Sequence, residues 1–118
     1  MTKVTSVIGV GCFTATESMR RNVNDVLDSG RLSYGEYSQR LERRFAQLHE
    51  SEFAVLSNSG TSSLQVALQT LKELHGWDDG DEVLIPAVTF VATANIVLHN
   101  RMMPVPVDID PLYYEIDE

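Results

Sequence analysis

The sequence predicts an α/β protein, in which amino-terminal helices are followed by alternating strand-helix units of a mainly parallel sheet. Before residue 50, apolar residues recur at helical spacing. After it, short apolar runs alternate with helical patterns, and turn residues separate them. Strands that alternate with helices in this way favour crossover connections and parallel pairing.

Residues 1–52 are expected to form an amino-terminal helical segment. Thr14 and Glu17 have the spacing of a capping box at the start of a first helix. Gly30 stands where that helix is expected to end. A second helix is predicted over residues 36–49, because apolar side chains fall on one of its faces and charged ones on the other.

Residues 53–118 are expected to form the first, incomplete part of an α/β domain. Its strands are predicted over residues 53–56, 82–85 and 104–107. Helices are predicted after the first two strands. Ligands of parallel sheets gather beyond the carboxyl ends of the strands, so we expect the site where these helices begin.

The segment between the strand at 53–56 and the next helix is the strongest candidate site. It contains Ser59, Gly60, Thr61 and Ser62. Unpaired N–H groups and the positive end of the helix dipole favour an anion at a helix start, and glycine allows close approach. These residues predict a phosphate site. The alternative is that the hydroxyls only cap the helix. The Gly-x-x-x-x-Gly-Lys pattern of nucleotide P-loops is absent.

Phe90 starts the helix that follows the strand at 82–85. An aromatic ring at that position can stack on a flat heteroaromatic ligand. The sequence pattern alone nevertheless favours packing of Phe90 in the core.

The charge of the chain argues against some classes of binding partner, and its cysteine content indicates the cellular compartment. The net charge of −8, with no basic stripe, argues against nucleic acid and anionic membranes as partners. Cys12 is the single cysteine and is expected to be a packed thiol in a reducing compartment. The apolar run at residues 4–13 is too short and interrupted for a secretion signal or a membrane span. A cytoplasmic location is therefore expected.

No metal site is expected. The histidines do not share a ligand spacing, and the acidic turn at residues 78–82 lacks the spacing of an EF-hand. Asp108 and Asp110 follow the last strand, where they either contribute to a site or merely terminate the strand.

Six segments, in this order, resemble the amino-terminal third of the DegT-type sugar aminotransferases, which are fold type I enzymes that use pyridoxal 5′-phosphate (PLP). The segments are residues 30–35 (GRLSYG), 41–46 (LERRFA), 59–64 (SGTSSL), 80–86 (GDEVLIP), 89–94 (TFVATA) and 106–110 (PVDID). An ordered set of motifs is far more specific than any one of them.

The resemblance implies roles for matching positions. Gly60, Thr61 and Ser62 would bind the PLP phosphate, and Phe90 would stack against the pyridine ring. Residues 30–35 would lie near the active-site entrance, and the site would form at a homodimer interface. The resemblance also implies transfer of an amino group to a nucleotide-linked keto-sugar, with glutamate as the donor.

The chain departs from the family in its lysines. A PLP aminotransferase needs a lysine that binds the cofactor and moves a proton. Lys3 and Lys72 are the lysines present, and neither matches the family's catalytic lysine, which lies beyond the position of Glu118. We therefore expect an amino-terminal part that is inactive alone, with no catalytic residue of its own. The alternatives are a naturally short binding or regulatory module, a dehydratase-like relative whose lysine is replaced, or a nucleotide-binding protein unrelated to PLP.

Overall fold

The computed structural model describes Gly11 and residues 13–116, in two compact units, Met1–Phe53 and Ala54–Glu118. Most of the apolar run weighed as a secretion signal lies outside the described residues, as do Cys12 and the last two acidic residues. Among the described residues, no helix is both long enough and apolar enough to cross a bilayer.

The first unit contains two helices, α1 (Glu17–Asp28) and α2 (Glu36–Leu48). The predicted capping box at Thr14 is wrong, because Thr16 is the N-cap and its Oγ1 accepts the Met19 N–H at 3.3 Å. The helix thus begins two residues later, with Glu17 in its first turn, where a carboxylate favours the dipole. Gly30 follows the end of α1 with a φ of 67°, a left-handed conformation that suits glycine.

The apolar faces of α1 and α2 are largely exposed within this unit. Ala46 is the buried residue of α2, and α1 has none. The side chains of Val23 and Leu48 are 59% and 76% exposed. Hydrogen bonds of tyrosines order the unit instead: the Tyr37 hydroxyl donates to Asp25 Oδ2 at 3.1 Å, joining α2 to α1.

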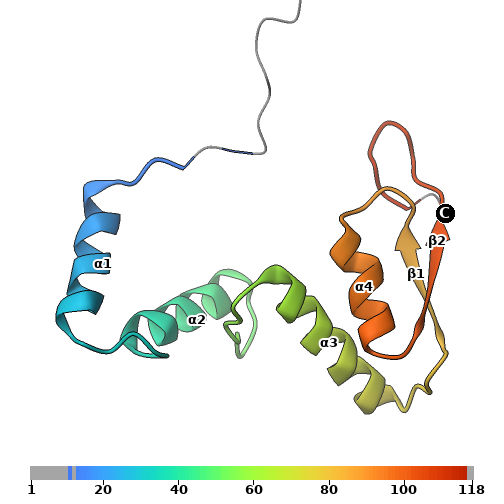
Figure 1. Cartoon of the computed structure of the whole chain (residues 1–118), viewed down its shortest axis with the longest axis horizontal. Coiled ribbons are helices and arrows are strands. Elements are labelled where there is room, and N and C mark those ends of the chain that lie inside the picture. The colour runs from blue at the N-terminus through green and yellow to red at the C-terminus, as the bar shows by residue number, and fades with distance from the viewer. Residues whose placement is uncertain (1–10, 12, 117–118) are drawn as a thin grey trace, which may run out of the picture. The chain divides into compact units, whose positions relative to one another are not determined.

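The second unit contains the helices α3 (Gly60–His75) and α4 (Val91–His99) and the strands β1 (Glu82–Pro86) and β2 (Met103–Val107). The strands pair in parallel, from Glu82 opposite Met103 to Pro86 opposite Val107. Helix α4 connects them and contacts both, and α3 packs beside α4 (Figure 1). The predicted parallel pairing of the strands at 82–85 and 104–107, connected through a helix, is confirmed.

The predicted strand at residues 53–56 is wrong. The structure assigns no strand to this segment, and the two strands that it describes pair with each other. A strand is defined by ladder hydrogen bonds to a neighbouring strand, so an apolar run alone does not specify one. Phe53 and Val55 are accordingly 76% and 87% exposed.

A small core lies between α4 and the sheet. Its buried members are Ile85, Ile96, Val97 and Met102, with Leu68 of α3 packed against them. Val97 is only 1% exposed. This core fixes where β1 ends and where α4 begins, which is the edge predicted to hold the site.

Candidate functional site

The start of α3 presents two backbone donors that the helix does not use. Ser59 is the N-cap, and its Oγ accepts the Ser62 N–H at 3.1 Å. The Ser63 N–H donates to the Ser59 carbonyl at 3.0 Å, which is the first hydrogen bond of the helix. The N–H groups of Gly60 and Thr61 come before that bond and are therefore available to an anion.

The serine hydroxyls around this helix start bond to one another. Ser59 Oγ donates to Ser62 Oγ at 3.0 Å. Ser57 Oγ donates to the Ser59 carbonyl at 2.8 Å and is also bonded to Ser63 Oγ. Because Ser57 has one proton to donate, Ser63 is the donor of their bond. Ser59 does cap the helix, and the other hydroxyls hold the turn around it.

The space in front of Gly60 is open. Apart from its chain neighbours and the backbone of its own helix, a Cβ built on Gly60 would meet no atom of the described residues within 4 Å. The first turn of α3 carries no acidic side chain, so no carboxylate there would repel an anion. Open space, two free N–H groups and the helix dipole are the properties that a phosphate site requires.

Phe90 is the N-cap of α4 and lies outside the core. Its backbone is extended, with φ −70° and ψ 143°, and its side chain is 75% exposed. The expectation that Phe90 packs in the core is therefore wrong. The ring precedes the first turn of α4, whereas the core is made by the helix face that carries Ile96 and Val97. The neighbouring Thr89 hydroxyl bonds to that of Thr93 at 2.9 Å.

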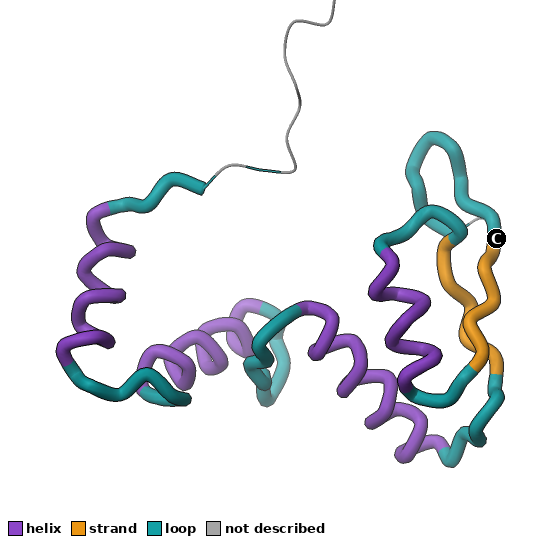
Figure 2. Tube along the Cα trace, viewed as in Figure 1, coloured by secondary structure: helices purple, strands orange, loops and turns teal. Residues whose placement is uncertain are grey.

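Phe90 and Ser59 are both N-cap residues, Phe90 of α4 and Ser59 of α3. Phe90 lies in the loop that follows the carboxyl end of β1, and Figure 2 shows this loop leading directly from the strand into α4. The hydrogen bonds of the described residues hold each group internally and do not join the two.

Asp108 and Asp110 end the strand β2 and shape the loop after it. Asp110 Oδ1 accepts the N–H groups of Leu112 and Tyr113, both at 2.7 Å. Asp108 Oδ1 accepts the N–H of Ile109 at 2.9 Å. Asp110 is thus engaged in a turn, which is the structural alternative that the sequence left open.

A buried lysine cluster at the other end of α3 was missed by the sequence analysis. Lys72 is 7% exposed, and its ammonium binds the Asp79 carboxylate and donates to the Asn100 carbonyl at 2.9 Å. Arg101 Nε lies 3.2 Å from the second oxygen of Asp79. Sequence spacing gave one signal only, a lysine on the apolar side of a predicted helix.

This part of the structure shows what Lys72 and the acidic turn at residues 78–82 do. Lys72 lies in the last turn of α3, away from the helix start, and its donors are engaged. The acidic turn is likewise used internally, since Asp81 Oδ2 accepts the Asp78 N–H at 2.9 Å. The hydrogen bond from Lys72, with the nearby Arg101 charge, lowers the pKa of Asp79 below its ordinary value of 3.8.

The segment expected near an active-site entrance lines an open hollow in the first unit. Its volume is about 710 Å³, and Arg31, Ser33 and Gly35 contribute to it. The Tyr34 hydroxyl donates to Glu42, and this hydrogen bond raises the pKa of Tyr34. Burial, followed by the hydrogen bond to Asp25, raises the pKa of Tyr37. Both phenols therefore stay protonated at neutral pH.

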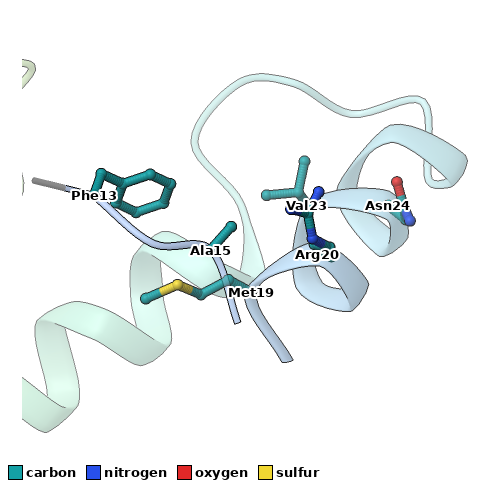
Figure 3. Close-up of a pocket in the computed structure, with 6 residues that line it drawn as sticks. All are labelled: Phe13, Ala15, Met19, Arg20, Val23 and Asn24. Carbon is teal, nitrogen blue, oxygen red and sulfur yellow. The ribbon is translucent and has the colours of Figure 1, made fainter. Parts of the chain in front are cut away.

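A second hollow of the first unit, about 330 Å³ in volume, is largely apolar (Figure 3). Phe13 and Ala15 line it from the segment before α1, and Met19 and Val23 line it from the helix. None of the side chains that line it was predicted to bind a ligand. Within the described part of the chain, no three histidine, cysteine or acidic side chains are grouped to hold a metal ion.

Comparison with known proteins identifies relatives of this chain. Residues 14–118 match the DegT/DnrJ/EryC1/StrS aminotransferase family. The chain is 46% identical over 96 residues to the L-glutamine:2-deoxy-scyllo-inosose aminotransferase of Micromonospora echinospora. That match covers 75% of this chain and 22% of the relative.

Solved structures of related proteins share the fold. A Streptococcus pneumoniae protein assigned as a sugar aminotransferase, in its PLP form, is 34% identical with a TM-score of 0.78, over 88% of this chain and 26% of that one. The E. coli GDP-4-keto-6-deoxy-D-mannose-3-dehydratase with bound hydrated PLP is 27% identical with a TM-score of 0.83, over 92% and 28%. The chain thus spans about a quarter of the length of these relatives.

The lowered pKa of Asp79 predicts a loss of stability in acid. The unfolded chain binds the Asp79 proton at a higher pH than the folded chain does, so the stabilisation is complete above the ordinary pKa of 3.8. It is lost as the pH falls from there through the lower folded value. Asp79→Asn should remove this part of the pH dependence, measured as urea unfolding midpoints from pH 7 to pH 3.

Asp28→Asn, at an exposed position of α1, serves as the control and should keep the parent's acid slope. An unchanged slope in Asp79→Asn would show that the contact with Lys72 does not carry the effect.

Proposed function

The chain belongs to the DegT/DnrJ/EryC1/StrS aminotransferase family, and from this we propose that it forms the amino-terminal part of a PLP-dependent sugar aminotransferase. The observation that carries the proposal is the helix start at Gly60, where open space faces two free N–H groups. The lysine required for catalysis is supplied by sequence beyond that matched here, since the chain spans about a quarter of its relatives.

The residues of the helix start fit the phosphate of PLP. The Gly60 and Thr61 N–H groups donate to its oxygens, and the Thr61 hydroxyl, on an exposed residue, adds a further donor. Ser59 and Ser62 hold the turn in the shape that presents these donors. When bound, PLP supplies an electron sink for amino-group chemistry.

Phe90 orients the flat face of the cofactor. Its ring is exposed at the carboxyl end of β1 and is not held by the core. Stacking there fixes the plane of the pyridine ring while the α3 donors fix the phosphate. Two points of attachment determine which face of the ring meets the substrate.

The proposed substrates are a nucleotide-linked keto-sugar and glutamate. The E. coli relative is named for a GDP-linked keto-sugar, and it matches 92% of this chain. We place the enzyme in the cytoplasm, as a homodimer. An alternative pair is favoured by the Micromonospora relative, whose name specifies L-glutamine and the cyclitol ketone 2-deoxy-scyllo-inosose.

An amino-transfer assay on the full-length protein distinguishes the two proposed combinations of ketone substrate and amino donor. We expect amination of a nucleotide-linked keto-sugar with glutamate as the donor. Amination of the cyclitol ketone with glutamine instead would select the second pair. Amination of neither, with PLP still bound, would favour a non-catalytic binding module or a dehydratase-like relative.

Gly60→Val should abolish PLP binding by the full-length protein without unfolding it. The added side chain fills the space that the phosphate needs but meets no protein atom near its Cβ. Equilibrium dialysis gives the PLP affinity, and thermal unfolding gives the stability. Thr70→Val, on the exposed side of the same helix, is the control and should bind PLP as the parent does. Unchanged PLP binding by Gly60→Val would refute the phosphate assignment.

Phe90→Ala should weaken PLP binding by about 1 kcal/mol, or about fivefold, through loss of ring stacking. Phe53→Ala is a matched control, because Phe53 is 76% exposed and Phe90 is 75% exposed. The dissociation rate of PLP, followed by its absorbance, distinguishes them. Equal rates in Phe90→Ala and the parent would remove Phe90 from the cofactor site.

A further inference from the structure

We propose that Lys72 is a positioning residue: together with Asn100 it fixes α3 against α4, and thereby holds the phosphate donors at the start of α3 in their working place relative to Phe90. This role depends on the proposed function of those donors and of Phe90. Lys72 does not touch the cofactor in this proposal. It acts through the two helices that carry the groups that do.

Lys72 makes a bond that spans the two helices. Its side chain is 8% exposed, and its ammonium donates to the Asn100 carbonyl at 2.9 Å, at the end of α4. A buried ammonium is costly unless its donors are paired. Movement of α4 away from α3 would break this pairing, so the lysine opposes that movement.

Asn100 supplies a second attachment. It is 4% exposed, and its Nδ2 donates to the Gln65 carbonyl of α3 at 3.2 Å and to the Ile96 carbonyl of α4 at 2.7 Å. Gln65 and Lys72 are seven residues apart, which corresponds to about 10 Å along a helix. Both bonds end on Asn100, so they restrain the inclination of α3 at the carboxyl end of α4 as well as its distance from that end.

The inclination matters because the functional groups lie far along the helices. From Lys72 to Gly60 is about 18 Å of helix, and from Asn100 to Phe90 is about 15 Å. A rotation of about 5° at the attachment would move Gly60 by about 1.6 Å. Misplacement of about 1 Å can cost a site about a hundredfold in rate. The separation of the phosphate donors from Phe90 is therefore sensitive to the attachment.

Neighbouring contacts show why the lysine, and not the exposed ion pair, carries this role. Arg101 is 78% exposed and meets the Asp79 carboxylate on its solvent side. Exposed pairs contribute little and are screened by salt. Removal of Arg101 leaves the bond between Lys72 and Asn100 in place. Arg101→Gln is thus a control that alters the same cluster without freeing α3.

The test is a double-mutant cycle on PLP binding by the full-length protein. Lys72→Met keeps the aliphatic stem and removes the ammonium. We expect it to weaken PLP affinity about tenfold and to alter the circular dichroism of the bound cofactor. Arg101→Gln should stay within about twofold of the parent. In a Phe90→Ala background the effect of Lys72→Met should shrink, because the ring to be positioned is gone.

The outcomes are distinct. If the parent does not bind PLP, the proposed function fails and this role falls with it. If the parent binds PLP and Lys72→Met has the same affinity and spectrum, or the same effect with and without Phe90, the positioning role alone is overturned. Should Lys72→Met not fold, Asn100→Ala removes the second attachment and is tested in the same two backgrounds with the same criteria.

Discussion

The burial of the Lys72 ammonium is the constraint on which the second unit depends. The charge is kept from water between α3, the turn that contains Asp79 and the end of α4, and the turn and the end of α4 each contribute an acceptor. A buried cation can be accommodated only if its acceptors are in place together. The lysine therefore links the end of α3 to the end of α4. The apolar core beneath it is small and could not by itself fix the direction of either helix.

Apolar surface is distributed unevenly in this chain. The second unit buries a compact cluster, whereas the apolar faces of α1 and α2 remain open in the first unit. An amphipathic helix gains most of its stability by burying that face. In the first unit, polar contacts of Tyr34 and Tyr37 hold the local arrangement instead. The relatives that share these helices are about four times as long as this chain.

Much of the fold could be predicted from local patterns. The helices and the parallel pair were predicted within a few residues, because period and turn residues are local signals. Local patterns could not decide whether residues 53–56 form a strand, because a strand is defined by its pairing with another segment, which the apolar run itself does not reveal. The donors at Gly60 followed from the chemistry of a helix start. The exposure of Phe90 and the bond between Lys72 and Asn100 could not be predicted, because they depend on how segments distant in the sequence meet.

The pairing of β1 with β2 has a consequence for the synthesis of the chain. The two strands are separated by one short helix, so their paired residues, such as Glu82 and Met103, lie 21 positions apart in the sequence. Closing such a short connection costs little entropy, and local contacts form rapidly. We therefore expect this unit to assemble as soon as it leaves the ribosome, before any downstream sequence exists. The outer side of each strand, which the partner strand does not occupy, would then be a place where a further strand can pair.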